Sequence, residues 1–124
     1  MKLKRQVKIR DSRDRYFSVA LSSLKHARTK QNYEWDISVE DVRELYEEQD
    51  GLCALSGVLM TTHRDGTGAR ETNASVDRIS PDVGYRRNNI QLVCWAVNKM
   101  KGTLNQAEFW FWCENVSRRA NANK

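Results

Sequence analysis

Residues 74–102 read ASVDRISPDVGYRRNNIQLVCWAVNKMKG, and this stretch decides the fold. Residues 74–79 are typical of a strand, and the Ser-Pro-Asp-Val-Gly run at 80–84 predicts a turn. Residues 89–94 carry apolar side chains at alternate positions, as in a second strand, and the apolar spacing then becomes helical as far as Gly102. The stretch therefore predicts a strand, a turn, a second strand and a short helix.

Helical patterns lie on both sides of this unit. Apolar residues recur at three- and four-residue spacing from 13 to 27, and a second helix is expected after Ser38, its N-cap. The short apolar run at 52–60 predicts a strand or hairpin edge, and Asn105 is the expected N-cap of a last helix. The buried stripe of that helix would consist of Phe109, Trp112, Cys113 and Val116. We therefore expect an α+β fold with two N-terminal helices, a β-hairpin with its short helix, and a C-terminal helix.

The chain has 124 residues, which is enough for one domain. We expect a basic flexible arm at 1–12, a single domain at 13–120 and a frayed tail at 121–124. The longest apolar stretch is far shorter than the ~20 residues of a membrane span, and no apolar segment follows the basic N-terminus as in a signal peptide. The three cysteines are then expected to be reduced thiols in a cytoplasmic protein with no membrane partner.

Charge is segregated along the chain. The net charge is +5, but residues 1–30 contain ten Lys and Arg against two Asp, whereas residues 31–60 contain one Arg against eight acids. The basic segment favours a polyanionic partner, and the alternative is a solvated tail that aids solubility. The acidic segment would repel nucleic acid, so its helix is expected on the far side of the molecule.

Two oxygen-bearing side chains stand out in residues 74–102. Asp77 lies on the first expected strand and Asn98 on the short helix, so a helix packed across the hairpin can bring them together. A carboxylate with an amide carbonyl suits a hydrated Mg²⁺ ion, with Mn²⁺ as the alternative, better than zinc.

These residues resemble the HNH, or ββα-metal, endonuclease family, in particular its small phage-type members. Asp77 matches the first metal ligand of that family, Asn98 matches the last, and Asn89 matches the middle Asn that holds the finger and the catalytic residue in place. The family's catalytic His follows the first ligand, and here that position is Arg78. Arginine stays protonated and is a poor general base, but it binds phosphate and stabilises negative charge well.

The remaining site residues follow from this resemblance and from charge. Arg78 and Asn89 are the expected catalytic residues, and His63 is the candidate for a substitute base, although a lone His in a polar loop is more often a solvent-exposed bystander. No zinc site is expected, because each Cys-x-x-Cys pair of the family retains one cysteine here, and the cysteines are taken as core residues. The candidate DNA contacts are the basic residues Lys4, Arg5, Lys8, Arg86, Arg87, Lys99 and Lys101.

The resemblance implies a divalent-metal-dependent DNA endonuclease that nicks or cuts double-stranded DNA. The alternative is a catalytically degenerate module that binds DNA without cleaving it, which the arginine at position 78 favours. The sequence leaves open whether the substrate is DNA or RNA, the recognition sequence and the oligomeric state. A hydrated metal adds little to folding, so Asp77→Ala and Asn98→Ala are expected to abolish cleavage with stability near wild type.

Overall fold

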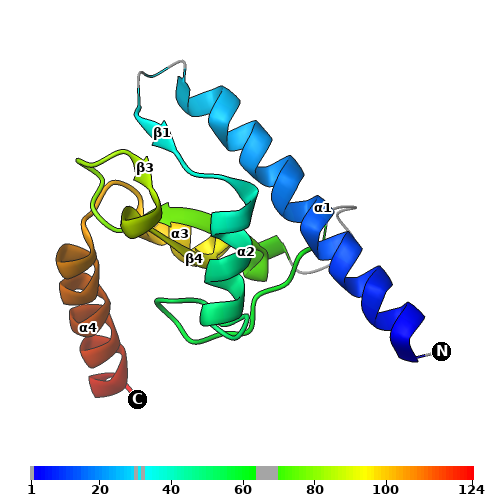
Figure 1. The fold of residues 1–124 in the computed structure, drawn as a ribbon. Coiled ribbons are helices and arrows are strands. Elements are labelled where there is room, and N and C mark those ends of the chain that lie inside the picture. The colour runs from blue at the N-terminus through cyan, green and yellow to red at the C-terminus, as the bar shows by residue number, and fades with distance from the viewer. Residues whose placement is uncertain (1, 30, 32, 64–69) are drawn as a thin grey trace.

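The computed structural model describes residues 2–29, 31, 33–63 and 70–124, which share one apolar core (Figure 1). The α+β class predicted from the sequence is confirmed. The elements are α1 (Lys2–Thr29), β1 (Trp35–Asp36), α2 (Val39–Glu48), η1 (Arg70–Thr72), β2 (Ala74–Arg78), β3 (Tyr85–Arg86), η2 (Arg87–Asn89), β4 (Ile90–Cys94), α3 (Trp95–Lys101) and α4 (Gln106–Ala122).

The expected hairpin and helix are present in the predicted order. β2 pairs with β4 in an antiparallel sheet in which Val76 faces Leu92 and Asp77 faces Gln91. α3 begins directly after β4, and η1 lies beside it. Leu92 and Val93 are among the most deeply buried side chains, so this unit forms the centre of the core.

α1 is longer than predicted. The segment 1–12 was expected to be a flexible arm, but the helix begins at Lys2 and continues to Thr29 without a break. The reason is compositional, because this segment contains neither Gly nor Pro and is rich in Lys and Arg, which favour helix. Phe17 and Leu21 anchor α1 to the core.

α2 has the N-cap that the sequence predicts. The Ser38 hydroxyl accepts a hydrogen bond from the Asp41 N–H, and the Asp41 carboxylate accepts one from the Ser38 N–H at 2.8 Å. The helix packs Val42 and Leu45 into the core. Residues 52–60 form no strand. An antiparallel bridge between positions 52 and 59 and the turn at 54–56 instead make them a tight hairpin, which agrees with the hairpin alternative.

A second, parallel sheet of β1 and β3 was not predicted. Trp35 pairs with Tyr85 and Asp36 pairs with Arg86. The strands approach closely at Gly84, where an added Cβ would lie 2.5 Å from the Cβ of Glu34. A glycine at this turn therefore lets the segment after α1 pack against the hairpin loop.

α4 begins at the predicted N-cap, Asn105, but its apolar stripe is not buried as expected. All residues of α4 are described, and Phe109 is the only one of them that is buried. Cys113 is partly covered, whereas Trp112 and Val116 are 55% and 66% exposed. The prediction of an amphipathic helix is therefore confirmed, but the prediction that its apolar stripe is buried is wrong, because the described part of the chain does not cover this face. None of the described helices combines the length and apolar character needed to span a bilayer.

Candidate nucleic-acid interface

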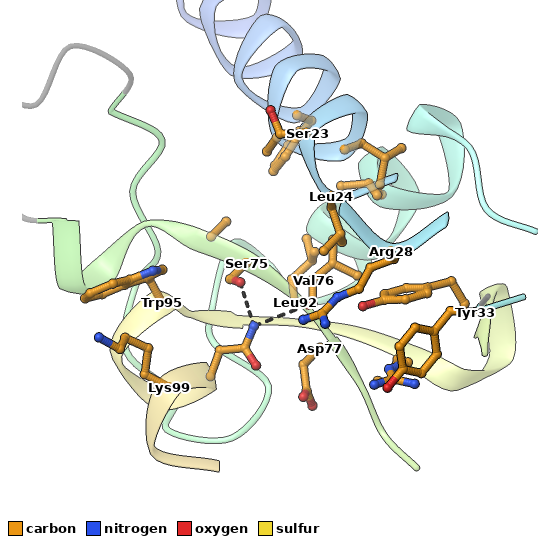
Figure 2. Close-up of a pocket in the computed structure, with 18 of the residues that line it drawn as sticks. Ser23, Leu24, Arg28, Tyr33, Ser75, Val76, Asp77, Leu92, Trp95 and Lys99 are labelled. Atoms are coloured by element: carbon orange, nitrogen blue, oxygen red, sulfur yellow. Dashed lines mark hydrogen bonds between the residues drawn. The ribbon is translucent and has the colours of Figure 1, made fainter. Parts of the chain in front are cut away.

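A cleft of about 810 Å³ lies between α1, β2 and α3. It brings together four of the predicted site residues, which are Asp77, Arg78, Asn98 and Lys99. Figure 2 shows Arg28 reaching over the sheet from α1, while Trp95 and Lys99 lie together on α3. The cleft is therefore formed by a helix on one side and by the hairpin with its short helix on the other.

Asp77 is bound by a buried lysine. The side chain of Lys101 is 1% exposed, and its ammonium group lies 2.9 Å and 3.0 Å from the two carboxylate oxygens of Asp77. The same ammonium donates to the carbonyl of Arg78 at 2.7 Å, and Gln91 Nε2 donates to Asp77 Oδ2 at 3.0 Å. Lys101 was predicted to contact DNA, and its burial contradicts that prediction.

Asn98 lies beside β2 and helps to fix α3 there. Its Nδ2 donates to Ser75 Oγ at 2.7 Å and to the carbonyl of Val76 at 3.3 Å. Asn98 and Asp77 line the same cleft, as the sequence predicts.

The two expected metal ligands do not fit a divalent cation in this arrangement. Both carboxylate oxygens of Asp77 already face an ammonium group, which supplies the positive charge that a cation would supply. A divalent ion could reach Asp77 only if Lys101 moved away. In the described ranges no group of three or more His, Cys, Asp and Glu residues is placed to hold a metal ion. Binding of Mg²⁺ or Mn²⁺ stays a prediction.

Arg78 is held at the rim of the cleft. Its Nη1 donates to the carbonyl of Pro81 at 2.8 Å, and its guanidinium lies over the rings of Tyr33 and Tyr85, 4.1 Å and 5.2 Å from their centroids. These contacts orient the guanidinium plane without neutralising its charge, so Arg78 can bind a phosphate but cannot accept a proton.

Asn89 is buried where β4 begins, and it ties the preceding loop together. Its Oδ1 accepts from the Ser80 N–H at 3.0 Å, while its Nδ2 donates to the carbonyls of Ser80 and Gly84 at 3.1 Å and 3.0 Å. The structure thus gives Asn89 a bracing position, whereas its part in catalysis stays a prediction.

His63 does not join the other site residues. It is exposed, and its backbone N–H and carbonyl are both bound by the side chain of Asn73 at 2.9 Å. It is not among the described residues that line the cleft. Its proposed role as a substitute base is therefore not supported by its position.

The two arginines of the hairpin loop are paired with acids. Arg86 binds Glu34 with 2.8 Å between Nη2 and Oε2, and this hydrogen bond lowers the pKa of the Glu34 carboxyl. Arg87 binds Glu48 of α2 at 3.0 Å. The pair with Glu48 places the acidic helix α2 beside Arg87, contrary to the prediction that this helix lies on the far side of the molecule, whereas contact of Arg86 and Arg87 with DNA stays a prediction. Two acids of the acidic segment, Glu34 and Glu48, are thus paired with these arginines.

Four cations at the cleft differ from these arginines. Within the described residues, Arg28, Arg70, Arg78 and Lys99 form no ion pair with a carboxylate. Arg70 and Lys99 lie over the Trp95 ring, with 4.4 Å and 4.6 Å to its centroid. Arg28 Nε is buried and has no hydrogen-bond partner among the described atoms.

Sequence reasoning missed Arg28 and Arg70. Arg28 follows Leu21 and Leu24 at seven- and four-residue spacing, which places it on the edge of the buried face of α1 and could have identified it. Arg70 carries no such signal, since it ends a long polar loop. The side chains of Lys4, Arg5 and Lys8 lie outside the described part of the chain.

Comparisons with known proteins found no matching family model, no matching curated protein and no matching solved structure.

Proposed function

We propose that the protein binds the sugar–phosphate backbone of nucleic acid, double-stranded DNA in the first instance, in the cleft between α1, β2 and α3. The observation that carries this proposal is the group of four cleft cations, Arg28, Arg70, Arg78 and Lys99, none of which has an ion-pair partner among the described residues. Among the described residues, the only carboxylate that lines the cleft belongs to Asp77, and Lys101 neutralises it. The described residues that line the cleft therefore carry a net positive charge.

The aromatic rings of the cleft support nucleic acid over other polyanions. Trp95 and Tyr33 lie directly beneath the cations, so each ring fixes the direction of a positive group without competing for its charge. Arginine groups held in this way suit phosphate, because their planar forks bind two oxygens at once. α1 also carries most of the excess positive charge of the sequence, and it forms one wall of the cleft.

Binding of a fluorescent DNA duplex at several salt concentrations tests the proposal. Arg70→Ala and Lys99→Ala should each weaken binding for any sequence and should reduce the slope of log K against log salt by about 0.9, the value for one phosphate contact. Arg118→Ala is the matched control, because Arg118 is an exposed arginine on α4 paired with Glu114. If both cleft variants bind like this control, the cleft is not the interface.

Cleavage of the bound strand is a second candidate function. It is favoured by the convergence of Asp77, Arg78 and Asn98 on the cleft that would hold the backbone. Incubation of the protein with supercoiled plasmid in Mg²⁺, Mn²⁺ or EDTA tests it. Metal-dependent nicking that Asn98→Ala abolishes would support cleavage, whereas tight binding with no product in any metal would support a module that only binds.

A further inference from the structure

The exposed face of α4 is a large apolar surface without a covering element in the described part of the chain. The rings of Phe111 and Trp112 pack edge to face with centroids 5.2 Å apart, and Val116 lies one turn further along the helix. These side chains are 56%, 55% and 66% exposed. We call these three residues the α4 patch. α4 stands at one edge of the molecule, so the patch is open to a partner (Figure 1).

Opposite charges border the α4 patch at its two ends. Glu108 lies one turn before Trp112, and Arg119 lies one turn after Val116, the last residue of the patch. Steps of three or four residues connect these positions, so all of them share one face of the helix over about three turns. Along the helix, this face therefore presents an acidic residue first, then aromatic residues, then an aliphatic residue and finally a basic residue.

We propose that this face pairs with the same face of a second copy of the chain, with the two α4 helices antiparallel. In an antiparallel pair related by a two-fold axis, Glu108 of each copy meets Arg119 of the other, while the apolar patches cover each other. A parallel pair would instead place Glu108 against Glu108 and Arg119 against Arg119. The order of charges along the face therefore selects a symmetric antiparallel dimer, independently of what the cleft binds.

The two end charges are free to act in this way. Glu108 is exposed and uses Oε1 to accept from the Asn105 N–H, which leaves Oε2 available. Arg119 is exposed and forms no ion pair within the described residues, whereas the neighbouring Arg118 is already paired with Glu114. A single helix face is a small interface, so we expect a reversible, concentration-dependent dimer.

Sedimentation velocity of the full chain over a wide range of protein concentration tests the proposal. Wild type should show a monomer–dimer equilibrium, and Trp112→Glu should be monomeric where wild type is mostly dimer. The substitution is at an exposed residue, so the monomer fold should survive, and circular dichroism checks this. A wild type that is monomeric at every concentration would overturn the proposal and assign the patch to a different protein, and so would a Trp112→Glu variant with unchanged dimerisation.

Charge reversal tests the antiparallel arrangement. Arg119→Glu and Glu108→Arg should each raise the dimer dissociation constant about tenfold, because each turns two weak attractions into two repulsions. The double variant should return to within about threefold of wild type, even though it shares the lost helix cap of Glu108→Arg. Arg15→Glu, with the same change in net charge at an exposed position on α1, should leave the constant unchanged. A double variant as weak as the single variants would overturn the arrangement.

Discussion

A buried ammonium group needs strong partners, and Lys101 has them in the carboxylate of Asp77 and the carbonyl of Arg78. The pair holds the end of α3 against β2, at a position where the side chain of Asp77 is 5% exposed. Asp77 therefore has a structural role that does not depend on a metal ion.

Loss of either partner should destabilise the fold strongly. Lys101→Met and Asp77→Ala should each lower the free energy of unfolding by about 3–5 kcal/mol, because each leaves one charge buried without its partner. Urea denaturation measures the effect. This corrects the expectation from sequence that Asp77→Ala leaves stability near wild type.

A variant with both changes distinguishes the loss of the ion pair between Lys101 and Asp77 from a general loss of side-chain packing. The double variant Asp77→Ala/Lys101→Met should be much less destabilised than the sum of the single variants, since it removes both charges. Arg118→Ala, at an exposed pair, should cost well under 1 kcal/mol. Additive losses in the double variant would show that the two charges do not interact.

At this scale, the sequence predicted correctly which residues share a site, because their chemical type limits what they can do. It did not predict correctly which side chain is buried, because burial depends on how the helix is oriented. Asp77 and Asn98 were expected to share a site and do line one cleft. Lys101 was expected to be exposed, as lysines near helix ends usually are. Its burial depends on the angle at which α3 crosses β2, and nothing in the local sequence reports that angle.

At the scale of elements, α1 is connected to the hairpin by a half-buried tyrosine. The hydroxyl of Tyr16 donates to the carbonyl of Ala74 in β2 at 2.6 Å, and burial raises the pKa of Tyr16 above its usual 10.0. Burial also raises the pKa of Cys94 on β4 to about 11, helped by the charge and hydrogen bond of Cys53. Both groups are neutral when protonated, so the fold favours their protonated forms.

Stability should consequently fall at alkaline pH. The contribution of Tyr16 is fully present below about pH 10 and is lost as the pH rises through its higher pKa in the folded state, while that of Cys94 is lost between pH 9 and about 11. Tyr16→Phe should cost about 1 kcal/mol at neutral pH and should make the alkaline loss smaller. Urea denaturation at several pH values measures both, and a curve for Tyr16→Phe parallel to wild type would contradict the assignment.

The elements themselves differ in how far sequence could predict them. The hairpin and α3 were predictable because their pattern and turn signals are local. β1 and β3 consist of two residues each and pair across about half of the chain, so no local pattern marks them. α4 was predicted as an amphipathic helix, but sequence cannot tell whether the body of the chain or a partner covers the apolar face.

At the scale of the whole molecule, positive charge is concentrated on one long helix. Residues 1–10 contain five Lys and Arg, and they precede Phe17, the first described residue that α1 buries. A change confined to residues 1–10 therefore leaves every core residue that the structure describes unaltered.

Deletion of residues 1–10 should therefore weaken DNA binding with little loss of stability. The salt slope should fall by about 0.9 for each phosphate contact that is lost. A variant with all five basic residues replaced by Gln keeps the helix propensity and serves as the matched comparison. If both variants bind with unchanged affinity and slope, this end of α1 only aids solubility.

The two sheets also differ in the length of chain that each must close. Only residues 79–89, which Asn89 braces, separate β2 from β4 along the chain. In contrast, α2, the loop that follows it and β2 all separate β1 from β3. Closing a longer loop costs more entropy before any contact is gained, so short-range pairs form early on a folding pathway. The hairpin should thus serve as the nucleus, and the docking of β1 on the turn at Gly84 should come late, after the rate-limiting barrier.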